Sequence, residues 1–424
     1  MIHHIHRAAL GLAIVALPAA ALAQDVTPAQ VVQTYADIAL AGYEDSLSTA
    51  VGLGQAIDAL LATPSEETLT AARNAWLTAR VPYMQTEAFR FGNAIVDDWE
   101  GRVNAWPLDE GLIDYVATSY GTESDENALY TANVIAGPTL RIGGQEVTVD
   151  PITPDAIADV LHEADGNEAN VASGYHAIEF LLWGQDLNGT GEGAGARPAT
   201  DYDLNACTGG NCERRAQYLK AASDLLIADL EEMVGNWTED GAARVALAEG
   251  GDDAALSAIL TGMGSLSYGE LAGERMKLGL LLHDPEEEHD CFSDNTHASH
   301  FFDAAGIQNV YLGTYIRMDG SLVEGPSLAD YVAQTQPDLD RELRTNMGIT
   351  MARMRIMASR AFSVEAYDQM LAEGNVEGNT IVQAVIDGLV TQTRTIERVV
   401  DALGLTQVTI EGSDSLDSPE AVFQ

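Results

Sequence analysis

Apolar residues recur at three- and four-residue spacing along most of the chain, the periodicity of helices that bury one face. This pattern predicts a helix over residues 30–61 and a second from residue 65 to about residue 91, kinked at Pro82. A short hairpin is expected at residues 139–149. We therefore expect an all-α fold with at most a small β-hairpin. Further helical patterns begin at residue 154 and cover residues 167–183, 213–237, 252–283, 327–357 and 379–403.

The glycine-rich stretch over residues 184–212 is the best boundary between domains. It predicts an N-terminal helical bundle over residues 24–195 and a C-terminal helical bundle over residues 196–410. A disordered tail is expected at residues 411–424. Irregular regions are expected in the two bundles, at residues 92–111 and 284–313.

Acidic residues are placed similarly in the two halves of the chain. Glu87 lies on a long predicted helix and precedes Asp109 in the irregular region that follows. Glu274 precedes Asp294 in the same way in the second half. This correspondence suggests that the two bundles arose by duplication of one helical unit.

The first residues have the pattern of a secretory signal peptide, which we place at residues 1–23. A mildly basic start that ends at Arg7 is followed by an apolar stretch over residues 8–17 and by the small residues Ala21 and Ala23. No cysteine follows this predicted cleavage point, so we expect no lipid anchor. No later stretch is apolar for long enough to span a membrane. We expect a soluble protein exported to a bacterial periplasm.

The charge of the chain is strongly acidic. It has 65 acidic against 21 basic residues, for a formal net charge of −44. This balance argues against nucleic acid or an anionic membrane as a partner and favours cations or basic partners. Most of the carboxylates are expected to lie in solvent, and the acidic run at residues 286–290 is interpreted as a solvated loop.

The chain has three cysteines. Cys207 and Cys212 flank a short glycine-containing turn, and in an oxidising compartment we expect them to form a local disulfide. A metal-binding cysteine pair is less favoured, because the chain has no second pair. Cys291 is expected to be buried and reduced.

The main candidate site lies in an apolar segment at residues 174–184. It carries His176 and Glu179, which are three residues apart and would share one face of a helix. An imidazole and a carboxylate suit iron, zinc, manganese or nickel. The same spacing also occurs by chance in ordinary helices. Burial in an apolar stretch favours a functional pair, because an unpaired buried charge is costly.

Further ligands must come from distant parts of the sequence. We consider Glu87 and Asp109 as additional metal ligands. Glu87 would otherwise form a salt bridge with Arg90, and Asp109 would otherwise cap a helix. A second polar pocket is expected in the other half of the chain, from Glu274, Asp294 and His297.

Several motifs together resemble the imelysin family. The Gly174-x-His176-x-x-Glu179 motif carries the resemblance. The supporting stretches are residues 83–92, Asn104-Ala-Trp-Pro-Leu-Asp109, Phe292-Ser-Asp294-Asn-Thr-His297 and Gly306-Ile-Gln-Asn-Val-Tyr311. The cysteine turn and residues 197–202 are most similar to the iron-regulated branch of the family. The resemblance implies two helical bundles in one chain, a cell-envelope location and a link to iron uptake, with His176 and Glu179 in the family's GxHxxE motif.

These observations lead to two functional hypotheses. The favoured one is a periplasmic protein that binds a metal ion or an iron complex and passes it to an envelope transport protein. Iron is the expected metal, with zinc or manganese as the alternatives. The other hypothesis is a metallopeptidase with a His- and carboxylate-bound metal, since the family has been classed with such enzymes. A scaffold whose ancestral site is now structural is a third reading.

Overall fold

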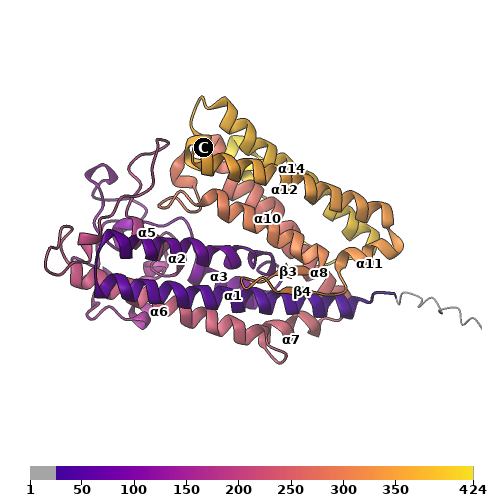
Figure 1. Ribbon diagram of the computed structural model, residues 1–424, viewed down its shortest axis with the longest axis horizontal. Coiled ribbons are helices and arrows are strands. Elements are labelled where there is room, and N and C mark those ends of the chain that lie inside the picture. Colours follow the sequence, from indigo (N-terminus) through magenta and orange to yellow (C-terminus); the bar gives the residue numbers. More distant parts are fainter. Residues whose placement is uncertain (1–24, 424) are drawn as a thin grey trace, which may run out of the picture.

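The computed structural model describes residues 25–423, and the predicted signal peptide lies outside this range. The described chain is built from helices with two short two-stranded sheets, so the expected all-α fold is confirmed. Figure 1 shows long helices in two groups, with α1 in the lower group and α14 in the upper one. Helices α2 and α10 contact each other across the two groups.

The first group is organised around the 35-residue helix α1, Pro28–Ala62. Thr27 caps this helix in a reciprocal capping box with Gln30. Helices α2 and α6 pack along α1, and α5 packs against both of them (Figure 1). The other helices near this group are shorter. The bounds are α2 Glu66–Met84, α3 Ala94–Asn104, α4 Pro154–Ala156, α5 Gly174–Trp183, α6 Cys212–Trp237 and α7 Ala242–Glu249.

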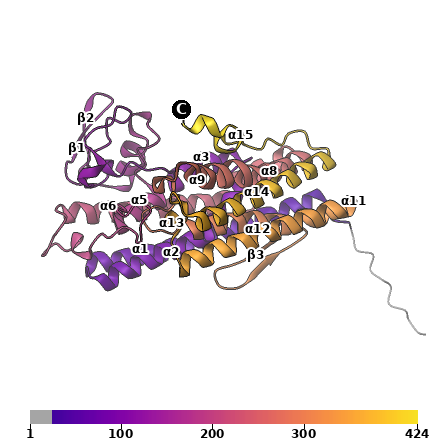
Figure 2. The ribbon, with the colours of Figure 1, turned by 90° about the horizontal axis from the view of Figure 1, so that it is seen from above.

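In the second group, α12 and α14 lie side by side and pack against each other more extensively than any other two elements of the group (Figure 2). A π-helical segment, Leu266–Lys277, continues α8 and packs against α14. Pro337 begins α12 and separates it from α11, so the single helix expected at residues 327–357 is two helices. The bounds are α8 Asp252–Ser265, α9 Leu278–Leu282, α10 Thr296–Leu312, α11 Leu328–Thr335, α12 Pro337–Ser363, α13 Tyr367–Leu371 and α14 Val376–Leu403.

The division of the helices differs from the sequence prediction. Helix α6 packs against α1 and α5, so the first group continues beyond residue 195. The regions expected to be irregular contain α3 and α10. The helix expected at residues 167–183 begins only at Gly174, whose backbone has a φ of +78°.

Two β-hairpins project from the helical body. The first pairs β1, Thr139–Ile142, with β2, Gln145–Thr148, and has Gly143 and Gly144 at positive φ in its turn, as expected. The second pairs β3, Thr314–Ile316, with β4, Leu322–Glu324, and was not expected. Both strands of this second hairpin contact α1.

Residues 411–423, where we expected a disordered tail, are ordered in the structure. They include the short helix α15, Asp414–Asp417, which contacts the π-helical segment. Ser415 is buried and its hydroxyl donates a hydrogen bond to the Gly273 carbonyl over 3.0 Å. The tail therefore covers part of the second helical group.

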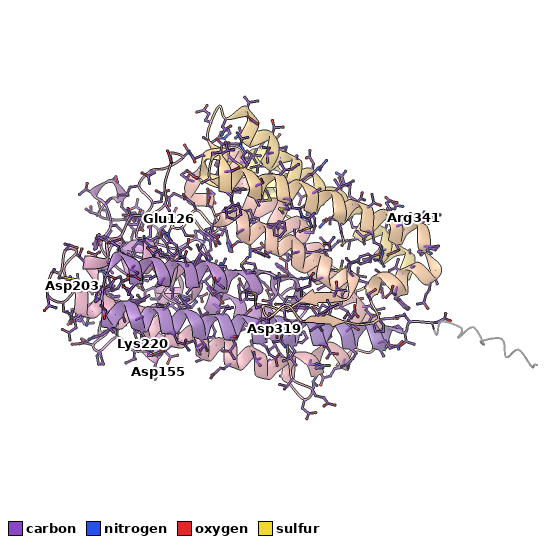
Figure 3. The ribbon with its side chains drawn as sticks, viewed as in Figure 1. Glu126, Asp155, Asp203, Lys220, Asp319 and Arg341 are labelled. Atoms are coloured by element: carbon purple, nitrogen blue, oxygen red, sulfur yellow. A yellow bond between two sulfur atoms is a disulfide. The ribbon has the colours of Figure 1, made fainter. Side chains whose placement is uncertain are left out.

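Cys207 and Cys212 form a disulfide, with their Cα atoms 5.9 Å apart, and Cys291 is free and only partly buried. Within residues 25–423, no helix combines the length and the apolar character that crossing a membrane requires. Charged side chains such as Glu126, Asp155 and Arg341 lie at the periphery of the molecule (Figure 3).

Candidate metal centre

Helix α5 places the candidate pair, and its first residue explains the glycine of the motif. Gly174 has a φ of +78°, and a Cβ atom there would lie 2.3 Å from the carbonyl oxygen of Val103. Only glycine fits such a position without moving the backbone. From Gly174 to Trp183 every residue of the helix is buried. The helix therefore carries its two polar side chains into the interior of the protein.

His176 and Glu179 contact each other on α5. The Nδ1 atom of His176 lies 3.1 Å from Oε2 of Glu179, and the two side chains are 1% and 0% exposed. The other carboxylate oxygen, Oε1, accepts hydrogen bonds from the backbone N–H of Ser293 over 2.9 Å and from its hydroxyl over 2.6 Å. Glu179 is therefore engaged on both oxygens, and its contact with Nδ1 leaves Nε2 of His176 as the available ligand atom.

Two residues from the second half of the chain complete the cluster. His176, His289 and Asp290 each offer a ligand atom, and these atoms lie within 4.8 Å of one another. Among the described residues this is the only such group of histidine, cysteine and acidic side chains. The loop at residues 286–290 is thus not wholly solvated as we expected, because His289 and Asp290 are 1% and 0% exposed.

Arg80 on α2 holds the second-half residues in place. Its Nη2 atom lies 2.9 Å from Oδ1 of Asp290 and 3.3 Å from Nδ1 of His289. Its Nη1 atom donates a hydrogen bond to Oδ1 of Asn104 over 2.6 Å. The guanidinium also lies over the ring of Tyr175. This buried ion pair therefore links the two helical groups.

Asp290 is held in its ionised form by these contacts. Its Oδ2 atom accepts hydrogen bonds from Asn295 and Ser299 in addition to the Arg80 contact at Oδ1. Burial opposes ionisation, yet Arg80 and the two donors keep the pKa of this carboxyl below its ordinary value. The cluster thus contains a carboxylate at neutral pH.

The imidazoles of the cluster are neutral at the same pH. Burial lowers the pKa of His176 to about 3, and the nearby Arg80 adds to this effect. Burial and Arg275 lower the pKa of His289 well below its ordinary value. Nε2 of His176 is buried and has no hydrogen-bond partner among the described residues. A neutral imidazole with an unpartnered nitrogen is the form that binds metals.

Two cavities reach the cluster from different sides. One of about 380 Å³ is lined by His176, Asp109 and Glu110, and one of about 480 Å³ is lined by His289 and Glu274. Trp106 and Pro107 line both cavities. The imidazoles are thus buried but lie next to space that an ion could cross.

The additional ligands that we considered do not join this cluster. Glu87 is buried and forms a 2.8 Å ion pair with Arg275, and not the expected pair with Arg90. Arg90 instead contacts Asp97 at 2.9 Å. Asp109 lines the cavity next to His176 and accepts a hydrogen bond from Asn127, without capping a helix through its side chain.

The second polar pocket that we expected is also not assembled. Glu274 lines the cavity next to His289. Asp294 and His297 lie beside each other, with Nδ1 of His297 3.1 Å from the Asp294 carbonyl oxygen. Neither belongs with Glu274 to a convergent group of ligand atoms in the described part of the chain. The residues that sequence reasoning missed are Arg80, His289 and Asp290. The one visible signal is that His289 and Asp290 lie just before the Phe292–His297 motif, with only Cys291 between.

Comparison with known proteins decides the family. Residues 39–396 match the family described as Imelysin. The chain belongs to the imelysin family. A curated relative, iron-regulated protein A of Synechococcus elongatus, is 35% identical over 85 residues. That match covers 20% of this chain and only 24% of the relative's length.

Two solved structures share the fold. A putative iron-regulated protein A precursor from Parabacteroides distasonis superposes with a TM-score of 0.62 at 19% identity, over 89% of this chain and 97% of that one. An imelysin-like protein from Psychrobacter arcticum has a TM-score of 0.57 at 16% identity, over 90% and 98% of the two chains. At these identities the likeness concerns the fold alone.

Proposed function

We propose that this imelysin-family protein binds a transition metal, with iron as its natural cargo, through His176, His289 and Asp290. The observation that carries the proposal is the convergence of these three buried side chains from distant parts of the sequence. Two neutral imidazoles and one carboxylate are a known donor set for Fe(II), and they also suit zinc and manganese. The family's GxHxxE motif supplies one of the ligands.

In this proposal Glu179 is not a ligand but the residue that positions one. Metal-bound histidines usually donate their other ring N–H to a carboxylate, which sets the tautomer and the orientation of the ring. Glu179 lies 3.1 Å from Nδ1 of His176, so it is placed for this role. This assignment revises our expectation that both residues of the motif bind the metal.

Arg80 determines the charge balance of the proposed site. Its guanidinium neutralises Asp290, so the three ligands and Arg80 together carry little net charge before a metal binds. A bound cation has to share Asp290 with Arg80, which lowers its affinity and favours exchange over permanent retention. Such a balance suits a protein that captures a metal and passes it on.

We place this activity in iron uptake or homeostasis in a bacterial periplasm, with an envelope transport protein as the receiver of the metal. The names of the relatives support an iron-related role, because two of them are called iron-regulated protein A. The word precursor in one name supports export of that relative. The metallopeptidase hypothesis has less support, since Glu179, the acid nearest to His176, is held by Ser293 and is not free to act as a base.

The test is anaerobic calorimetry with Fe(II), Zn(II) and Mn(II) on the full chain and on His176→Ala and His289→Ala. We expect about one bound metal per chain in the wild type and loss of that binding in each variant. Elemental analysis of protein purified from its native compartment identifies the metal. Equal binding by the wild type and both variants contradicts the proposal.

A further inference from the structure

Four acids line a small cavity beside the 286–290 loop, together with Gly189, Pro285, Cys291 and Phe292. It has a volume of about 10 Å³, which is room for one water-sized particle. Asp186 comes from the loop after α5, and Asp368 from the start of α13. The remaining acids, Glu286 and Glu288, belong to the segment between α9 and α10.

Two of the four carboxylates are buried and form no ion pair among the described residues. Glu288 and Asp368 are 1% and 2% exposed, and none of their four carboxylate oxygens has a hydrogen-bond partner among the described residues. Asp186 is partly engaged, because its Oδ1 atom accepts hydrogen bonds from Asn188. Glu286 lies at the exposed rim. The side chain of Thr296 lies beside Glu288 and the backbone N–H of Gln369 beside Asp368, and each opposes the rise in the pKa of its neighbouring carboxyl that burial causes.

No positive side chain compensates this cluster. Among residues 25–423, no lysine, arginine or histidine nitrogen lies within 4.0 Å of a carboxylate oxygen of Asp186, Glu286, Glu288 or Asp368. Burial raises the pKa of Asp368 to about 7; the Gln369 backbone N–H opposes this rise and the charge of Asp186 adds to it. Isolated buried carboxylates are costly, and natural proteins pair them or use them to coordinate metals.

We propose that this cavity binds a hard divalent cation, Ca²⁺, through Glu288 and Asp368 with Asp186 and Glu286 at its rim. All four ligands offer oxygen, which calcium prefers, and none offers the nitrogen or sulfur favoured by zinc. The ligands come from two loops and a helix start. Calcium tolerates the variable geometry that such segments provide, whereas Mg²⁺ requires a nearly ideal octahedron.

The acids surround the cavity without converging on one point. Their ligand atoms do not come within 4.8 Å of one another in groups of three or more, as the atoms of the His176 group do. The cation therefore draws the loops inward or binds some carboxylates through water, which calcium readily does. Binding would tie the loop after α5 to α13 and to the segment that carries His289.

This site goes beyond the proposed iron-binding function and shares none of its ligands. The direct test is calorimetry with CaCl₂ and a thermal melt on the full chain, on Asp368→Asn and on Glu288→Gln. Glu287→Gln is the matched control, because Glu287 has the same charge and lies in the same loop but lines the other cavity. His176→Ala serves as a second control, since it removes a proposed iron ligand only.

We expect one saturable calcium site in the wild type, and a loss of affinity of about tenfold or more in Asp368→Asn and Glu288→Gln. The two control variants should bind Ca²⁺ like the wild type. Because each substitution keeps the size of a buried carboxyl that has no ion-pair partner, both variants should melt no lower than the calcium-free wild type, which shows that they fold.

Three results overturn the proposal. One is the absence of saturable binding by the wild type at about 1 mM Ca²⁺, the weak end of the range for extracellular sites. The second is a Ca²⁺ affinity in Asp368→Asn and Glu288→Gln that equals that of the wild type. The third is a loss of Ca²⁺ affinity in Glu287→Gln as large as in those two variants, which would indicate diffuse attraction to an acidic surface. Preferential binding of Mg²⁺ or Mn²⁺ overturns the assignment to calcium. Fe(II) binding in the same variants reports on the other site independently.

Discussion

Replacement of Glu179 by glutamine separates the two roles that this residue could have. The amide keeps the shape of the side chain, and its oxygen can still accept both hydrogen bonds from Ser293. The substitution replaces the carboxyl that contacts His176 Nδ1 over 3.1 Å with an amide. Loss of a carboxylate that orients a metal-bound histidine lowers metal affinity by about 10- to 100-fold. That corresponds to about 1.4–2.8 kcal/mol of binding free energy.

Anaerobic calorimetry with Fe(II) on the wild type, Glu179→Gln and His176→Ala measures this difference. We expect an intermediate loss in Glu179→Gln and a complete loss in His176→Ala. Glu110→Gln is the matched control, because Glu110 lines the cavity next to His176 without contacting His176. This variant should bind Fe(II) with the affinity of the wild type. Unchanged affinity in Glu179→Gln refutes the positioning role. A loss as deep as that of His176→Ala would show that Glu179 is itself a ligand.

Three further predictions concern stability. Asp290→Asn leaves the buried Arg80 guanidinium without its carboxylate. This variant should lower the free energy of unfolding, measured with urea, by about 3–5 kcal/mol. A change below about 1 kcal/mol argues against the ion pair. Gly174→Ala should cost about 1–3 kcal/mol in thermal unfolding, because its Cβ meets the Val103 carbonyl, and an unchanged melting temperature would show that the helix start can relax. Burial raises the pKa of Glu100 to about 7 despite the opposing charge of Arg90, so the folded chain keeps this proton where the unfolded chain has lost it. Stability should therefore fall as pH rises from about 4.3 to about 7, and this fall should be smaller in Glu100→Gln; parallel pH profiles for the two proteins contradict the shift.

The helices that bury one continuous apolar face were predictable from the sequence. Helix α1 is an example, with predicted bounds of 30–61 and observed bounds of Pro28–Ala62. Helix α10 was missed because polar residues such as His300 and Asp303 are buried among its apolar ones, and this mixture hides the periodicity. Helix α3 was missed because it is short and follows the turn at Gly92.

Half of the candidate site was predictable for a similar reason. His176 and Glu179 lie three residues apart on one helix, so local spacing was enough to pair them. His289 is brought to His176 only by the packing of the two helical groups. This packing cannot be predicted from the local spacing of residues. The acidic residues around His289 suggested solvent exposure, since a carboxylate such as Asp290 is rarely buried without a partner. Its partner, Arg80, lies 210 positions away.

The most direct test of the proposed metal centre is anomalous diffraction at the iron edge from crystals of the full chain grown with Fe(II). We predict one strong peak among His176, His289 and Asp290, at about 2.0–2.2 Å from the Nε2 atom of His176. The same map from His176→Ala crystals should lack that peak. A wild-type map with no iron at these residues, or with iron only at the acidic cavity around Asp368, would contradict the account.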